Sequence, residues 1–156
     1  MTGKFAGYHF FVISLLTHGR RQANNWVKAM PQTVVRLYRD ATGATPIEQW
    51  LESLETSDSV IYAKCLNVIL LLHNYGYELR RPQSDALADG IRELRVRKNK
   101  VHYRILYFAC GENVVCLSHG ITKEGKVPEK EIAIAKKRML EVQSNLRKYT
   151  KNWTVQ

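Results

Sequence analysis

Arginines stand at alternating positions in two neighbouring segments of this 156-residue chain, at Arg95 and Arg97 and then at Arg104. Alternate residues of a strand share one face, so parity predicts one sheet face that carries these arginines on adjacent strands. A guanidinium offers fork-shaped donors that match phosphate oxygens. These residues therefore predict a phosphate-binding surface. The alternative is a solvated face on which Arg95 pairs with Glu93 or Asp89.

The charge of the whole chain also favours a polyanionic partner. Twenty-four Lys and Arg residues against fourteen Asp and Glu give a net charge of +10, and the isoelectric point is about 9.7. Residues 80–104 alone hold eight basic and three acidic side chains. Such a concentration indicates nucleic acid first and a membrane surface second, whereas a general aid to solubility is the alternative.

His119, at the end of a predicted strand, is the candidate for proton transfer. The usual pKa of a histidine side chain lets it gain and lose a proton near neutral pH. A lone histidine there can equally be a hydrogen-bonded structural residue. Ser118 is not expected to complete a triad with it, because neighbours on a strand point to opposite faces. Lys123 and Lys126, taken alone, are typical loop lysines.

No motif predicts a metal or a cofactor. The chain has no HExxH, CxxC, Walker or GxGxxG pattern. Three cysteines without metal-ligand spacing, Cys65, Cys110 and Cys116, are expected to be reduced and structural in a cytosolic protein. We therefore expect neither a metal site nor a bound cofactor.

Four short segments rich in β-branched and aromatic residues predict strands, over Thr33–Tyr38, Ile91–Arg97, Val101–Cys110 and Val114–His119. The short links between the last three predict an antiparallel meander. Within the third segment, parity assigns alternate residues to a buried face against helices, at Tyr103, Ile105 and Tyr107. The opposite face then carries His102 and Arg104 over an apolar floor of Leu106 and Phe108.

Helical periodicity positions these strands. Thr45-Pro46-Ile47-Glu48 predicts a capped helix start running to about Leu54, and a second helix spans about Ser57–Tyr75, ended by Gly76. A last helix begins near Pro128, and its apolar residues repeat at spacings of three and four, at Ile132, Ala135, Met139, Val142, Leu146 and Tyr149. The element order is β-α-α-β-β-β-α.

Residues 1–31 differ from the rest, with no acidic and four basic side chains. Their apolar run Phe10–Leu16 is too short for a bilayer, which needs about 20 residues. We expect an extension, or a true start near Met30, in preference to an export signal.

Three segments carry a family resemblance: Glu93-Leu94-Arg95-Val96-Arg97, Tyr103-Arg104-Ile105-Leu106-Tyr107-Phe108, and Leu117-Ser118-His119-Gly120-Ile121-Thr122-Lys123 before a basic helix. They resemble the RelE/ParE superfamily of toxins, in particular its phage-related HigB-like branch, over Thr33 to about Tyr149. The resemblance implies an α+β fold in which two helices cover a small, mostly antiparallel four-stranded sheet, followed by a C-terminal helix. It implies a toxin domain over 32–150, an extension over 1–31 and a tail over 151–156.

The resemblance also implies a function, that of a type II toxin that cleaves mRNA on the ribosome without a metal, using the RNA 2′-hydroxyl as nucleophile. The residues carried over as catalytic are Arg95, Arg104, His119 and Lys123, and those carried over as RNA-binding are Arg97, Lys98, Lys100, His102 and Lys126. Implied partners are the ribosome, mRNA and a helix-turn-helix antitoxin, in the cytoplasm and without a membrane. Glu93 stands where some ribonuclease members carry a basic residue, which leaves open a gyrase inhibitor of the ParE type or a decayed, non-catalytic nucleic-acid-binding module.

Overall fold

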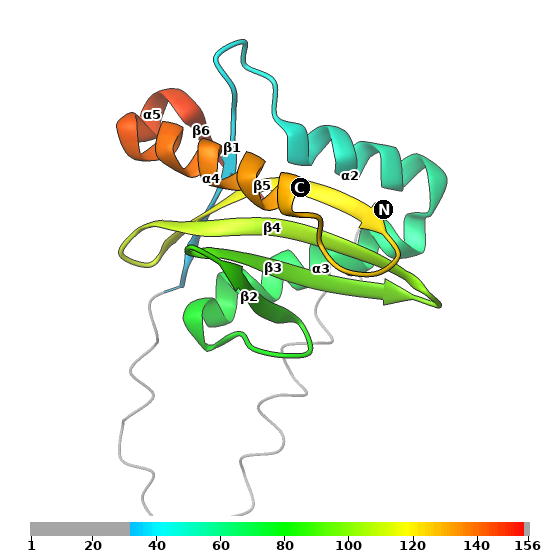
Figure 1. Ribbon diagram of the computed structural model, residues 1–156. Helices are drawn as coiled ribbons and strands as arrows, with labels where there is room; N and C mark the ends of the chain where they lie inside the picture. Colours follow the sequence, from blue (N-terminus) through cyan, green and yellow to red (C-terminus); the bar gives the residue numbers. More distant parts are fainter. Residues whose placement is uncertain (1–31, 155–156) are drawn as a thin grey trace, which may run out of the picture. The chain divides into compact units, whose positions relative to one another are not determined.

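The computed structural model describes residues 32–154, which build a six-stranded sheet (Figure 1). In spatial order the strands are β2 (Ser84–Ala88), β3 (Ile91–Lys98), β4 (Val101–Gly111), β5 (Val114–Lys123), β1 (Val34–Tyr38) and β6 (Thr150–Asn152). β1 is parallel to β5, and the other neighbouring strands of this sheet are antiparallel. The predicted extension over 1–31 and the alternative start at Met30 lie outside the described residues.

Helices pack on both faces of the sheet and form two apolar cores. On one face, α2 (Pro46–Ser57) and α3 (Ser59–Tyr75) bury Ile61 and Leu72 against Ile105 and Tyr107. On the other face, α4 (Glu129–Ser144) covers the apolar floor of β4. The short helices are η1 (Gly76–Glu78), which follows α3, and α5 (Leu146–Tyr149), which follows α4.

Tight turns set the register of the meander. Asp89 and Gly90 both have positive φ, 51° and 84°, in the link between β2 and β3, and Asn99 has φ 57° between β3 and β4. Asx and glycine residues tolerate this conformation, which matches the twist of a hairpin. Gly76 ends α3 with φ 49°, and a side chain there would meet Thr33, since an added Cβ would lie 2.2 Å from Thr33 Oγ1.

The α+β class, the four predicted strands and the three predicted helical segments are confirmed, with four corrections. The sheet has six strands, because β2 and β6 also pair. Lys151 and Asn152, assigned to a tail, belong to β6. Thr45 precedes α2 but makes no side-chain cap bond, and Asn145 interrupts the last helix, where its side chain accepts a hydrogen bond from Lys148 N at 3.0 Å.

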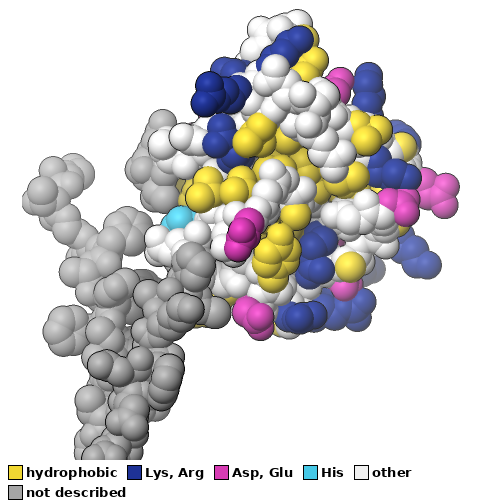
Figure 2. All heavy atoms as spheres, turned by 90° about the vertical axis from the view of Figure 1, so that its left-hand side faces the viewer, with side chains coloured by type: hydrophobic (Ala, Val, Ile, Leu, Met, Phe, Trp, Pro, Cys, Tyr) yellow, Lys and Arg dark blue, Asp and Glu magenta, His cyan; other side chains and the backbone are white. Residues whose placement is uncertain are grey.

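Basic side chains also lie on the surface outside the meander. Figure 2 views the side of the molecule that lies on the left in Figure 1, and it shows Lys and Arg side chains, with several Asp and Glu, around a group of hydrophobic side chains. Within the described chain the excess charge is nevertheless concentrated in residues 80–104, because the other described residues hold twelve basic and eleven acidic side chains. Among the described helices, none combines the length and apolar character needed to cross a bilayer.

Candidate phosphate-binding site

The strand register assembles the predicted site residues into three rows on one sheet face. Antiparallel partners that stand opposite each other share a face. The first row contains Arg97, His102 and Lys123; the second contains Arg95, Arg104 and Ile121; the third contains Glu93, Leu106 and His119. Leu106 packs in the core beneath α4, so this is the α4 side of the sheet. The parity prediction is confirmed, since Tyr103, Ile105 and Tyr107 lie on the side of α2 and α3.

Arg104 is the central and most enclosed cation of this face, with 5% of its surface exposed. Its Nε lies 2.9 Å from Glu93 Oε2, but the angles between the groups do not make a hydrogen bond. Arg104 Nη1 is also buried and has no hydrogen-bond partner among the described residues. A buried guanidinium with unused donors is costly unless a ligand satisfies it. Within the described residues, Arg104 therefore has two donors, Nε and Nη1, that remain free for a further hydrogen-bond acceptor.

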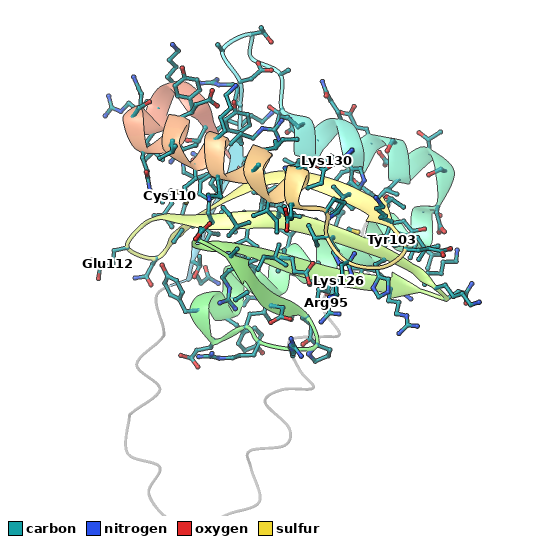
Figure 3. All side chains as sticks on the ribbon, in the orientation of Figure 1. Arg95, Tyr103, Cys110, Glu112, Lys126 and Lys130 are labelled. Carbon is teal, nitrogen blue, oxygen red and sulfur yellow. The ribbon has the colours of Figure 1, made fainter. Side chains whose placement is uncertain are left out.

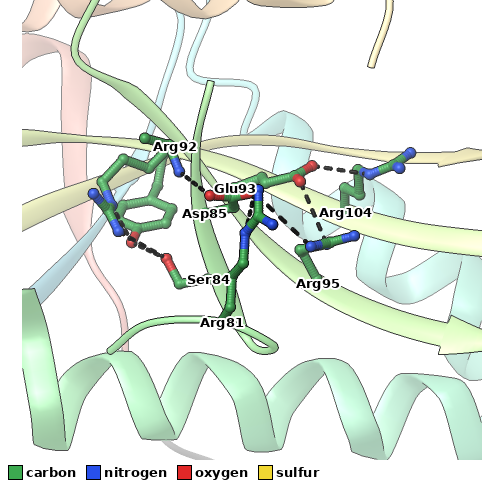
Figure 4. Close-up of polar contacts among 9 residues, drawn as sticks. Arg81, Ser84, Asp85, Arg92, Glu93, Arg95 and Arg104 are labelled. Carbon is green, nitrogen blue, oxygen red and sulfur yellow. Dashed lines mark hydrogen bonds and ion pairs between the residues drawn. The ribbon is translucent and has the colours of Figure 1, made fainter. Parts of the chain in front are cut away.

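Arg104 stands at one end of a network that also contains two carboxylates and two further arginines (Figure 4). Arg95 lies 3.5 Å from Glu93 Oε1 and 3.9 Å from Asp85 Oδ2, and Arg81 lies 2.6 Å from Asp85 Oδ2. Burial raises the pKa of Glu93, while Arg104 and Arg95 oppose that rise. The predicted alternative that Arg95 pairs with Glu93 is therefore present. The network still holds three guanidiniums against two carboxylates, so its balance is positive.

His102 is the titratable group in the outer row, between Arg97 and Lys123. It is half-buried, and Lys123 is exposed. Loss of hydration lowers the pKa of His102 below its usual 6.5, and the positive charges of Arg104, Arg97 and Arg95 lower it further. The ring is consequently neutral at pH 7 and can accept a proton. The sequence predicts His102 as an RNA-binding residue, and its register beside three arginines adds to the fall in its pKa.

His119 lies deeper, beneath α4, with 7% of its surface exposed. Its Nε2 donates to Glu131 Oε2 at 3.0 Å, and its Nδ1 lies 2.8 Å from Ser118 Oγ. Burial lowers the pKa of His119 and the charge of Arg138 adds to this, whereas Glu131 opposes the change. In this arrangement both ring nitrogens are engaged, and the imidazole ties β5 to the first turns of α4.

The contact between Ser118 and His119 corrects the expectation that these neighbours point apart. The register between β4 and β5 shifts after the pair of Leu106 and His119, so Ser118 occupies a bulge. A bulge turns adjacent side chains toward the same side. Ser118 is fully buried, however, so the chain of Ser118, His119 and Glu131 offers no accessible nucleophile.

The remaining predicted basic residues lie at the edge of the site. Lys98 forms an ion pair with Asp58, the residue that caps α3. Lys100 is exposed in the turn between β3 and β4, where Arg97 Nε also donates to Asn99 O at 2.7 Å. Lys126 is exposed in the loop between β5 and α4, while Arg95 projects from β3 (Figure 3). The structure therefore gathers Arg95, Arg104, His102 and Lys123 on one face, with the lysines of the turn and loop around it.

A family model now places this arrangement among known proteins. The model of the phage-derived Gp49-like proteins (DUF891) matches residues 49–140, which is more than half of the chain. The chain belongs to the Gp49-like family. This is a RelE-like family associated with the toxins of toxin–antitoxin systems. No curated protein matches the sequence.

The match covers the whole of the predicted site in this Gp49-like protein. It includes every predicted site residue from Arg95 to Lys126, together with Glu93 and Glu131. It leaves out β1, α5 and β6, which complete the sheet and the end of the α4 core. Within 32–154 there is no group of three His, Cys, Asp or Glu side chains placed to hold a metal ion.

Proposed function

We propose that this Gp49-like protein is the toxin of a type II system and cleaves mRNA in the ribosome, with the RNA 2′-hydroxyl as nucleophile. The observation that carries the proposal is the buried Arg104, whose Nη1 has no partner within the described chain, on a face that it shares with Arg95, His102 and Lys123. A preorganised cation in a low-dielectric site stabilises charge on a reacting phosphate more strongly than one in water. The HigB-like branch is the part of the superfamily that we propose for it.

Each group of the site then has a place in one reaction. His102 accepts the proton of the 2′-hydroxyl, and the resulting oxygen attacks the adjacent phosphorus. Arg104 and Arg95 stabilise the negative oxygens of the five-coordinate phosphate. The bond from phosphorus to the 5′-oxygen breaks, leaving a 2′,3′-cyclic phosphate, and Lys123 stabilises the negative 5′-oxygen. That oxygen takes up a proton from water, and the protonated His102 releases its proton to the solvent. Such proton transfer contributes roughly 10² to 10⁴-fold to a rate.

The outer lysines and Arg97 belong to binding in this proposal. Lys98, Lys100 and Lys126 supply non-specific attraction to ribosomal RNA and mRNA phosphates. The partner that inhibits the toxin is a helix-turn-helix antitoxin. The protein acts in the cytoplasm, where ribosomes are present.

Replacing Arg104 distinguishes a role of this residue in catalysis from a role in RNA binding. We expect Arg104→Ala to abolish growth arrest and in-frame mRNA cuts while ribosome co-sedimentation persists, since one lost donor at a reacting phosphate costs roughly 10² to 10³ in rate. Arg104→Lys should rescue poorly, because an ammonium lacks the guanidinium fork. Expression and solubility are checked by blot. Full toxicity of a soluble Arg104→Ala protein contradicts the catalytic role.

The two histidines are compared in the same induction experiment. His102→Asn is expected to slow cleavage strongly if this neutral imidazole is the base, whereas His119→Gln should act mainly through the docking of α4. The sequence-based assignment of His119 as the acid–base group predicts the reverse. Mapping of mRNA 5′ ends gives the cleavage rates, and thermal unfolding measures the structural effect of each change.

Two observations favour a second candidate, a ParE-like inhibitor of DNA gyrase. Glu93 lies against Arg104, and His119 is enclosed, so a function without phosphate chemistry would suit both residues. A plasmid supercoiling assay is run alongside the mRNA mapping. Relaxed plasmid with intact mRNA would select this candidate, and neither effect would select a non-catalytic module.

A further inference from the structure

A groove of about 550 Å³ lies beside the site, along the outer edge of β5. The ladder with β1 extends along β5 only to Leu117, and beyond it the groove is bounded by Gly120–Lys123, by α2 and by the start of α4. This volume falls within the range of about 300–1,000 Å³ that is typical of pockets for organic ligands. The groove has space for a flat group the size of a nucleobase.

Two aromatic side chains line this groove, Trp50 from α2 and Tyr103 from β4. The Trp50 ring lies directly on the backbone of Gly120, where an added Cβ would stand 2.0 Å from its Cδ2. Trp50 Nε1 donates to Thr122 Oγ1 at 3.2 Å. The absent side chain of Gly120 and this hydrogen bond together fix the indole before any ligand arrives, and a fixed ring loses little entropy when a base stacks on it.

The unpaired charges of the groove are positive. Asp58 is engaged by Lys98 and by the start of α3, and Glu131 accepts from His119. Lys123 and Lys130 also line the groove, and neither has an ion-pair partner in the part of the chain that is described. A surface that offers fixed aromatic rings and free cations suits single-stranded nucleic acid more than an apolar or basic peptide.

We propose that this groove binds an unpaired base of the RNA strand, stacked on Trp50 and Tyr103, with Lys123 and Lys130 at the neighbouring phosphates. The inference rests on the proposed function and adds to it a site for substrate selection. The groove lies next to the sheet face that carries Arg104 and His102. Two of the residues that line it are strand partners of these residues, since Lys123 stands opposite His102 and Ile121 opposite Arg104. A strand held at Arg104 can therefore place the next base around the edge of β5.

Tryptophan fluorescence tests the stacking directly. The chain has three tryptophans, and a Trp26→Phe/Trp153→Phe protein retains only Trp50. The probe is a 2′-O-methyl RNA tetranucleotide, which cannot be cleaved by the proposed reaction. We expect quenching of Trp50 by this probe, and none by an otherwise identical tetranucleotide without bases. Absence of quenching at saturating probe, with the protein folded, overturns the proposal.

Binding by the otherwise unaltered chain gives a second readout, so the proposal does not depend on the double variant. Anisotropy of the labelled probe should show about tenfold weaker binding for Trp50→Leu and a smaller loss for Trp50→Phe. Lys130→Gln, which alters only an exposed side chain, should weaken binding, and Lys64→Gln on α3 is the matched control that should not. Unchanged affinity in folded Trp50→Leu and Lys130→Gln proteins contradicts the inference and favours a protein as the ligand of the β5 edge.

The experiments distinguish an error in the proposed base-binding groove from an error in the proposed cleavage reaction. In-frame mRNA cuts by the wild-type chain, with the same positions and rate in Trp50→Leu, would overturn the groove alone. Quenching by the probe without any mRNA cuts would overturn the cleavage reaction alone and retain a base-binding groove.

Discussion

At Arg104, burial and ion pairing act in opposite directions on what the guanidinium can bind. Burial strengthens its attraction for an anion, whereas Glu93 at 2.9 Å already supplies one negative charge. Arg95 shares that carboxylate, at 3.5 Å. The two arginines together therefore carry more positive charge than Glu93 neutralises.

The first residue-scale prediction concerns the stability of this pair. Glu93→Ala leaves the enclosed Arg104 without its carboxylate and should lower the free energy of unfolding by about 3 kcal/mol. A matched apolar pair, Glu93→Leu with Arg104→Met, should recover most of that loss, because neither buried charge remains. Urea unfolding of the single and double variants measures both effects. A loss below about 0.5 kcal/mol in Glu93→Ala would mean that water reaches Arg104.

The second concerns His119 and pH. Its pKa is lowered in the folded protein, so the unfolded chain binds more protons between that lowered pKa and the usual 6.5. The contribution of His119 to stability is therefore complete above about pH 6.5 and is lost as the pH falls through that window. Unfolding free energies measured from pH 8 to 5 should fall in the wild type and fall less in His119→Gln. Subtracting the two curves removes the effects of Glu93 and other shared groups.

At the scale of elements, α4 is attached to the sheet by an apolar face and by polar contacts at both ends. Val142 and Ala135 are buried over Phe108 and Leu106. Near its start Glu131 accepts from His119, and near its end Glu141 accepts from Tyr38. The rows of the site lie beside and beneath this helix, so its docking controls how much of the face is open.

Replacing a buried residue of α4 by a carboxylate should undock it. Val142→Asp is expected to cost several kcal/mol, because Val142 is 1% exposed and the new charge has no partner. Leu140→Asp on the same helix, at a position that is 63% exposed, should change stability little. Thermal unfolding of both variants checks this, with a fall of about 10 °C or more expected for Val142→Asp alone. Similar melting temperatures would show that the buried face is not needed for the fold.

Long periodic elements could be predicted from the sequence, and short or irregular ones could not. The apolar repeat from Ile132 to Tyr149 is confirmed as one packing face, even across the break at Asn145. β2 lacks the β-branched residues that mark a strand, although Asp89-Gly90 after it is a hairpin signal that could have revealed it. β6 is three residues long and depends on its pairing with β1. The alternation of residues along the strand correctly predicted that Arg104 and His102 share a sheet face. No sequence pattern indicated the bulge at Ser118 or the burial of His119.

At the scale of the whole molecule, which has a net charge of +10, the number of phosphates that its basic side chains contact sets how binding responds to salt. Each phosphate contact on a single strand contributes about −0.7 to the slope of log affinity against log salt. Lys100→Gln and Lys126→Gln should each make the slope shallower by about that amount for a single-stranded RNA, with little change in sequence preference. Lys64→Gln, on a helix of the opposite sheet face, is the control. Equal slopes in all four proteins would place the RNA elsewhere on this basic surface.

The position of β1 has a consequence for how the molecule is made. β1 is the first strand of the described chain, yet its two neighbours in the sheet are β5 and β6, and β6 ends only at Asn152. During synthesis β1 leaves the ribosome with no strand to pair with, because its two partners lie 80 or more residues later in the chain. The six-stranded sheet can therefore be completed only after Asn152 has been added. Under the proposed function, we expect a nascent chain that has not reached β6 to hold the site on an incomplete sheet.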